Sequence, residues 1–116
     1  MLEDETPLDN IENDFGQEML SKRHLVIVCF WASWSGPCSI MDLILKALSV
    51  EFKGKIKVKK ISFDDNKLIG DKYNVNKEDL PVFLFFHKGK LLDRLAGLVS
   101  KNEFSFKIMA LLQTIK

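Results

Sequence analysis

The segment from Trp34 to Cys38 holds the residues with the clearest chemical meaning in this chain. Its sequence is Trp-Ser-Gly-Pro-Cys, so two residues separate the hydroxyl of Ser35 from the thiol of Cys38. Two thiols at this spacing would support thiol–disulfide exchange, in which one thiolate attacks a disulfide and the second thiol resolves the mixed disulfide. A serine cannot begin that reaction, because its hydroxyl is hardly ionised near neutral pH and is a poor nucleophile without an adjacent base.

Hydrolytic chemistry at Ser35 would require a general base within hydrogen-bonding distance of the hydroxyl. The only histidines are His24 and His87. His24 precedes the strand that leads to the turn, and His87 ends a later strand, so both are expected at the remote edge of a sheet. We therefore expect no Ser–His site, and we interpret Ser35 as the N-cap of the following helix, accepting a backbone N–H.

Periodicity and turn signals place the segment between a buried strand and a long helix. Residues 25–30 are continuously apolar and rich in β-branched side chains, which is typical of a central strand covered on both faces. Apolar residues at helical spacing after the turn predict a helix to about Phe52, and Gly54 follows it. The order βαβαββα after a leading helix predicts an α/β fold. The other expected elements are a first helix with a stripe of Ile11, Phe15 and Met19, a strand over 56–61, a short helix over 68–73, a hairpin of strands over 82–86 and 90–95, and a last helix capped by Ser100 and Glu103.

The chain resembles the thioredoxin family on several motifs in the same order. The Trp-Ser-Gly-Pro-Cys segment resembles the family's redox turn, and residues 26–32 resemble the buried strand before it. Leu80-Pro81-Val82 resembles the cis-proline loop, and Gly89 and Gly97 stand where the family has its hairpin and groove glycines. The resemblance implies a single domain over residues 1–116 with a thioredoxin fold, a central mixed β-sheet of four to five strands flanked by helices on both faces.

The resemblance assigns roles to three positions of a catalytic centre. Ser35 stands at the position of the nucleophilic cysteine, and Cys38 stands at that of the resolving cysteine. Cys29 stands where the family has a buried aspartate that assists proton transfer, so Lys60, which resembles the lysine near that acid, is expected to lack its usual partner. For Cys38, the alternatives are a buried inert thiol and slow monothiol exchange with glutathione or a partner. For Cys29, they are a small apolar core residue and a thiol beneath Cys38 that could pair with it.

Family members bind extended peptides across a surface beside the turn, and the resemblance transfers this surface to the chain. The implied partners are protein substrates with disulfides or extended peptide segments, and a thioredoxin reductase if the chain is redox active. No cofactor is implied. The Leu80–Pro81 bond is expected to be cis, which leaves the backbone of Leu80 free to pair with a bound strand. The expected binding residues are Trp34, Gly36, Pro37, Phe63, Leu80, Pro81, Ala96 and Gly97.

Three explanations remain open for Ser35. The first is an oxidoreductase whose nucleophile was replaced by design, since serine is the closest isostere of cysteine. The second is a natural family member that lost dithiol exchange and serves as a binding or regulatory module, and the third is a natural monothiol protein working through Cys38. The intact surroundings of the turn favour the first, whereas Cys29 in place of the acid favours the second. The lineage function is thiol–disulfide exchange with protein substrates, in which we expect this chain to be inactive or strongly impaired.

The composition argues against several other classes of protein. A net charge of +1 gives no global field that would attract nucleic acid or an anionic membrane. The lysines between residues 53 and 60 have no interleaved aromatic residues, so we interpret them as a solvated strand face. Two cysteines are too few for a secreted disulfide framework, and the spacing of Cys and His predicts no metal site. The acidic amino end lacks the features of a signal peptide, so we expect a monomeric cytoplasmic protein.

Overall fold

One four-stranded mixed sheet organises the molecule. The computed structural model describes residues 6–115, with side chains from residue 11 onward. The strand order is β2-β1-β3-β4, parallel between β1 and β2 and antiparallel between the other neighbours. The order of elements confirms the predicted α/β fold. The elements are α1 (Thr6–Phe15), η1 (Gln17–Leu20), β1 (Leu25–Trp31), α2 (Gly36–Glu51), β2 (Ile56–Ser62), α3 (Lys67–Lys72), η2 (Lys77–Asp79), β3 (Val82–His87), β4 (Lys90–Ala96) and α4 (Lys101–Thr114).

Strand β1 runs through the middle of the sheet, as its apolar sequence predicts. All of its residues except Trp31 are buried. It pairs with β2 in a register that sets Cys29 beside Lys60, and with β3 in a register that sets Phe30 opposite Val82. The end of β1 therefore lies beside the beginning of β3, which brings two distant parts of the sequence to the same end of the sheet.

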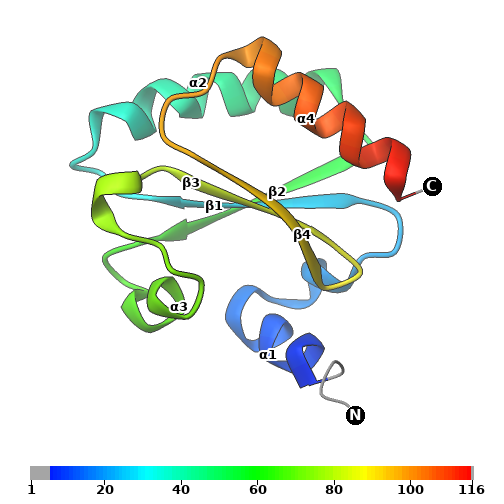
Figure 1. The fold of residues 1–116 in the computed structure, drawn as a ribbon, viewed down its shortest axis with the longest axis horizontal. Helices are drawn as coiled ribbons and strands as arrows, with labels where there is room; N and C mark the ends of the chain where they lie inside the picture. The colour runs from blue at the N-terminus through cyan, green and yellow to red at the C-terminus, as the bar shows by residue number, and fades with distance from the viewer. Residues whose placement is uncertain (1–5, 116) are drawn as a thin grey trace.

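Helices cover both faces of the sheet, as expected. Helices α2 and α4 lie on one face, and α1, η1 and α3 lie on the other (Figure 1). On the first face, Phe104 of α4 packs edge to face on Phe83, with ring centroids 4.9 Å apart. On the second, Phe15 of α1 packs on Phe30 and Phe86 at centroid distances of 6.2 and 5.8 Å. Each layer therefore has its own aromatic core against the sheet.

The N-terminal apolar stripe is buried as predicted, but it does not form one helix. Ile11, Phe15 and Met19 are all buried. Helix α1 ends at Phe15, and Gly16 follows with a φ of 96° before the separate 3-10 helix that contains Met19. Glycine adopts positive φ without steric cost and so ends helices readily. The continuous periodicity predicted the burial correctly and the helix length wrongly.

Two turn predictions are confirmed in detail. Lys88 and Gly89 have φ values of 54° and 79° and form the two-residue connection between β3 and β4. Positive φ at both positions is characteristic of the hairpin turn whose twist matches that of the strands. At the start of α4, the Ser100 hydroxyl accepts a hydrogen bond from the Glu103 backbone N–H at 3.1 Å.

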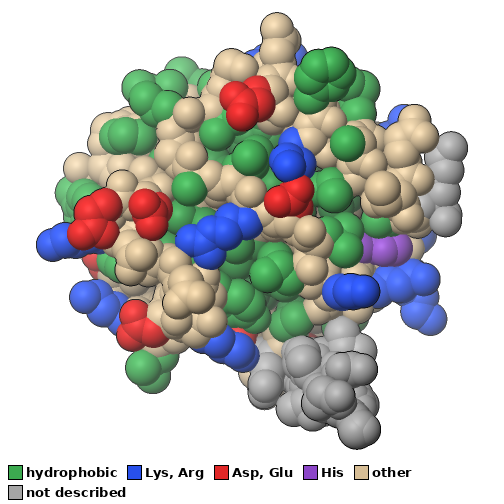
Figure 2. Space-filling model, in the orientation of Figure 1, with side chains coloured by type: hydrophobic (Ala, Val, Ile, Leu, Met, Phe, Trp, Pro, Cys, Tyr) green, Lys and Arg blue, Asp and Glu red, His purple; other side chains and the backbone are tan. Residues whose placement is uncertain are grey.

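Strand β2 forms one edge of the sheet and carries Lys57, Lys59 and Lys60. Lys59 pairs with Glu18 at 3.8 Å, and Lys60 pairs with Asp42 at 2.7 Å. These two ion pairs agree with a solvated, locally neutralised strand. Figure 2 shows the opposite side of the molecule, with β4 in front, and there too basic and acidic side chains are interspersed. Within the described residues, no helix is long and apolar enough to cross a bilayer.

Candidate functional site

The turn between β1 and α2 sets Ser35 at the start of a helix. Its backbone has the extended conformation of an N-cap (φ −98°, ψ 116°), and Pro37 occupies the first turn of α2, where proline is favoured. The Cys38 N–H donates to the Ser35 carbonyl at 3.2 Å. The Ser35 side chain, however, makes no capping hydrogen bond. The predicted position at the N-cap is confirmed, whereas the predicted hydroxyl cap is wrong.

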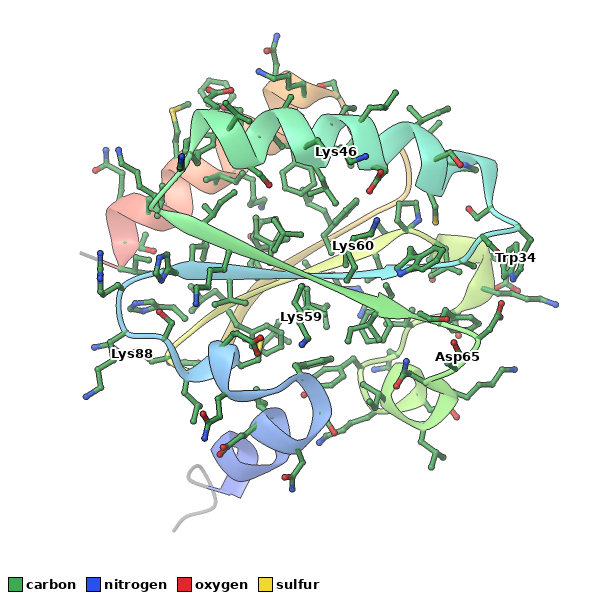
Figure 3. All side chains as sticks on the ribbon, turned by 180° about the vertical axis from the view of Figure 1, so that it is seen from behind. Trp34, Lys46, Lys59, Lys60, Asp65 and Lys88 are labelled. Atoms are coloured by element: carbon green, nitrogen blue, oxygen red, sulfur yellow. The ribbon has the colours of Figure 1, made fainter. Side chains whose placement is uncertain are left out.

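No histidine accompanies Ser35. His24 Nδ1 lies 2.9 Å from the Ser21 hydroxyl, and His87 Nε2 lies 3.2 Å from the Lys22 carbonyl oxygen. Both contacts occur at the end of the sheet where β1 begins. Figure 3 shows Trp34 and Lys88 at opposite ends of the molecule, which separates the hairpin beside His87 from the turn. Neither histidine can therefore act as a general base for the Ser35 hydroxyl.

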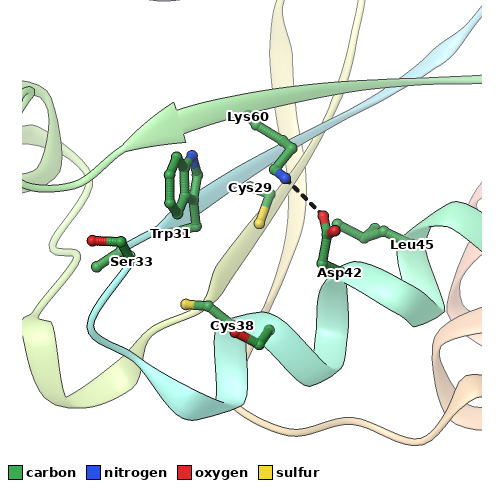
Figure 4. Close-up of a pocket in the computed structure, with 9 residues that line it drawn as sticks. Cys29, Trp31, Ser33, Cys38, Asp42, Leu45 and Lys60 are labelled. Carbon is green, nitrogen blue, oxygen red and sulfur yellow. Dashed lines mark hydrogen bonds and ion pairs between the residues drawn. The ribbon is translucent and has the colours of Figure 1, made fainter.

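A cavity of about 150 Å³ lies beneath the turn, between β1, β2 and α2. Its lining includes both cysteines of the chain, Cys29 from β1 and Cys38 from the first turn of α2. Trp31, Asp42 and Lys60 complete much of the wall (Figure 4). The structure therefore gathers the polar groups that the sequence separates by up to 31 positions around one space.

Cys29 is a protonated, buried thiol at neutral pH. Its side chain is 3% exposed and belongs to the core beneath α2. Burial raises the pKa of Cys29 to about 12, with smaller raising contributions from Cys38 and Asp42 against a lowering contribution from Lys60. Both cysteines are free thiols in this structure. At neutral pH, Cys29 cannot accept a proton as an ionised carboxylate would.

Asp42 is the residue that sequence reasoning missed. Lys60 donates to Asp42 Oδ1 at 2.7 Å, and Lys46 lies 3.2 Å from Oδ2. The hydrogen bond from Lys60 holds the pKa of Asp42 below its usual range, against the opposing effect of burial. Lys60, whose usual partner at position 29 is replaced by a cysteine, therefore pairs with Asp42 instead. Asp42 follows Cys38 by four residues on one helix, so it lies on the same face, and this spacing was the available signal.

The expected binding surface gathers at the end of the sheet beside the turn. Strand pairing sets Phe30 opposite Val82 and Val82 opposite Ala96, so the turn, Pro81 and Ala96 share that end. The peptide bond that precedes Pro81 is cis, as expected. Gly97 N–H donates to the Pro81 carbonyl at 2.8 Å, which closes the loop after β4 against the loop before β3.

The residues around this surface differ in what they offer to a partner. Trp34 is 55% exposed, and its indole N–H donates to Asp64 at 2.8 Å, so the ring is held at the surface. Phe63, expected as an apolar flank, is buried in the core and offers little surface. Leu98, which the sequence prediction missed, is 60% exposed directly after Gly97. An apolar residue next to the groove glycine was the signal for it.

Comparison with known proteins gives the family. The thioredoxin family model matches residues 7–110. The thioredoxin of Chlorobaculum thiosulfatiphilum is 32% identical over 97 residues, which cover 84% of this chain and 88% of that protein. The thioredoxin of Rickettsia felis is 36% identical over 91 residues, 78% of this chain and 85% of its own length. The thioredoxin of Porphyra purpurea is 35% identical over 88 residues, 76% and 80% of the two chains. The chain therefore belongs to the thioredoxin family and is by lineage a thiol–disulfide oxidoreductase.

Proposed function

We propose that this chain is a thioredoxin-family protein in which dithiol exchange is disabled at Ser35 and the binding of extended polypeptide segments is retained. The observation that carries the proposal is the turn itself. A hydroxyl without a neighbouring base occupies the start of α2, beside an exposed tryptophan and a cis-proline loop. Hydroxyl chemistry cannot replace a thiolate in attack on a disulfide.

The retained binding surface supports the second half of the proposal. Trp34 and Leu98 are exposed large apolar side chains, and Gly36, the first residue of α2, is exposed as well. Aromatic anchors contribute disproportionately to affinity at protein interfaces. Extended peptides bind through their backbone and add specificity through pockets for alternate side chains. A surface of this kind can hold a polypeptide without changing its disulfides.

Monothiol exchange through Cys38 is the second candidate. It is favoured by one observation, the free Cys38 thiol in the first turn of α2 directly beside the turn. Cys38 is only 7% exposed, so attack on a protein disulfide would require the turn to open. We place this candidate second for that reason.

The proposal carries expectations about partners and compartment. The partners are proteins with disulfides or extended segments, and a thioredoxin reductase takes part only where exchange proceeds. Two free thiols in one chain suit the reducing cytoplasm, and we propose a monomer there.

Insulin reduction in the presence of dithiothreitol tests the proposal. The chain as it stands and its Ser35→Ala variant should show no turnover above the dithiothreitol background, whereas Ser35→Cys should reduce insulin. A Ser35→Cys/Cys38→Ala double variant is the matched control, because it restores the nucleophile without the resolving thiol. Turnover by the unmodified chain would contradict the proposal. Inactivity of folded Ser35→Cys would show that the loss extends beyond position 35.

Binding is measured separately from turnover. Reduced and alkylated insulin B chain serves as an extended polypeptide that cannot exchange disulfides. Calorimetric titration should detect its binding to the unmodified chain and to Ser35→Ala with equal affinity. Absence of binding to both proteins would refute the retained-binding half of the proposal, whatever the outcome of the insulin assay.

A further inference from the structure

Both thiols of the chain face one interior cavity, and the proposed binding function uses neither of them. Cys29 projects from the central strand toward α2, and Cys38 projects from the first turn of α2 (Figure 4). Both residues line the same cavity, and both are free thiols. A space of about 150 Å³ remains between the groups that line it. Two sulfur ligands on separate rigid elements therefore flank an unfilled volume.

The donor set determines which ligand fits this volume. Within the described residues, no group of three or more His, Cys, Asp or Glu side chains is arranged to hold a metal ion. A structural zinc site requires four protein ligands, and magnesium and calcium require oxygen ligands, so none of these ions suits the cavity. Soft thiolate ligands select copper(I). A pair of sulfurs satisfies an ion that accepts linear, two-coordinate binding.

One ion pair of the cavity wall, Lys60 with Asp42, bears on whether an anionic complex can be held there. Two thiolates and one monovalent cation carry a net charge of −1, and burial of a charge without a counter-ion is costly. Lys60 is the register partner of Cys29 on β2 and lines the same cavity. Its ammonium group is held there by Asp42 at 2.7 Å and lies 5.4 Å from the centre of the Trp31 ring. Lys60 thus neutralises the Asp42 carboxylate, which lines the same cavity and would otherwise repel an anionic complex.

We propose that Cys29 and Cys38 form a two-coordinate site for a soft monovalent cation, copper(I), in the cavity beneath the turn. One Cu⁺ ion binds the two sulfur atoms, and both thiol protons leave to solvent, so the product is a bis-thiolate copper(I) complex. No electrons are transferred. A buried thiol without a metal ion keeps its proton, whereas coordination to a metal ion drives the loss of that proton. Sequence spacing alone carried no sign of the site, because its ligands lie on a strand and on a helix.

Anaerobic titration of the fully reduced protein with copper(I), in competition with the chromophoric chelator bicinchoninate, tests the site. Silver(I) is the redox-inert second probe, and native mass spectrometry counts the ions bound. One ion per chain is expected for each probe. Cys29→Ser and Cys38→Ser should each weaken binding on the order of 100-fold or more, because each removes one of two ligands. Ser39→Ala alters the cavity wall without removing a sulfur and should retain the affinity of the unmodified chain.

A second pair of variants tests the role of charge. Lys60→Gln should weaken copper(I) binding by about 10-fold, since outer-shell partners typically contribute that much to metal affinity. Lys46→Gln is the matched control, because Lys46 also contacts Asp42 but does not line the cavity, and it should leave the affinity unchanged. Circular dichroism establishes that each variant is folded before its affinity is compared.

Several results would overturn the proposal. Loss of binding in only one cysteine variant would show a single-sulfur contact, and one ion per two chains would show bridging between molecules. A product two hydrogens lighter and free of metal would show that the thiols oxidise to a disulfide rather than bind an ion. If the cysteine variants fail to fold, X-ray absorption of the copper-loaded unmodified chain decides the question. Two sulfur neighbours support the site, and nitrogen or oxygen neighbours refute it.

Discussion

Alkaline pH should destabilise the fold through one buried group, the Cys29 thiol. Burial raises the pKa of this thiol from 9.0 to about 12 in the folded chain. The unfolded chain therefore releases the proton first as the pH rises, and the stability contributed by the protonated thiol is present below pH 9 and lost between pH 9 and about 12. Integration of this linkage from pH 8 to pH 11 gives a loss of roughly 3 kcal/mol from Cys29. A loss of that size is a large share of the stability of a small domain.

Urea denaturation at pH 8, 9, 10 and 11 under reducing conditions measures this loss. The informative quantity is the difference in unfolding free energy between the unmodified chain and Cys29→Ala at each pH. That difference should shift by about 3 kcal/mol in favour of the variant from pH 8 to pH 11. Burial also raises the pKa of Tyr73, so its phenol contributes a second loss of folding stability at alkaline pH. Tyr73→Phe removes this loss and should act independently of Cys29.

Cys38→Ala is the matched thiol control, because it keeps the buried Cys29 and should retain the Cys29-dependent loss. Parallel stability curves for the unmodified chain and Cys29→Ala over the whole pH range would refute the reasoning. That result would mean that the folded chain solvates the Cys29 thiolate, and burial would fail as the cause of its raised pKa.

Phe104→Ala should lower the unfolding free energy by about 4 kcal/mol, because it removes a fully buried ring packed on Phe83. Urea denaturation measures the loss, and a value below about 1 kcal/mol would contradict the packing described for α4. Ser100→Ala should cost about 1 kcal/mol through loss of the hydrogen bond from Glu103 N–H, seen as a lower melting temperature. An unchanged melting temperature would show that the cap contributes nothing. Trp34→Ala should weaken binding of reduced, alkylated insulin B chain by about 10-fold while stability changes by less than about 1 kcal/mol. Equal affinity would remove Trp34 from the binding surface.

Local sequence signals predicted most of the fold. The apolar run of β1, the hairpin glycine at position 89 and the Ser100 cap each depend on neighbours within a few residues, so the chain itself reveals them. The helix break at Gly16 was harder to predict. The apolar spacing continues to Met19, whereas the backbone leaves the helix at a single residue with positive φ.

The candidate site was less predictable because its groups meet only through tertiary structure. Asp42 and Lys60 are 18 positions apart and pair because the register of β1 with β2 directs Lys60 toward α2. The exposure of Leu98 and the burial of Phe63 likewise depend on how loops pack at the end of the sheet. The residue types of the turn identified it in the sequence, whereas tertiary structure determines which side chains surround the turn.

The lysines of β2 have a consequence for the behaviour of the protein at high concentration. An edge strand presents unpaired backbone groups on which another chain can add a strand, and charged side chains, especially lysine, block such growth. Lys57, Lys59 and Lys60 occupy three of the seven positions of the edge strand. Lys59 and Lys60 pair with Glu18 and Asp42, so two copies brought edge to edge would have to desolvate these charged side chains. We therefore expect strand β2 to resist the addition of a strand from another copy of the chain.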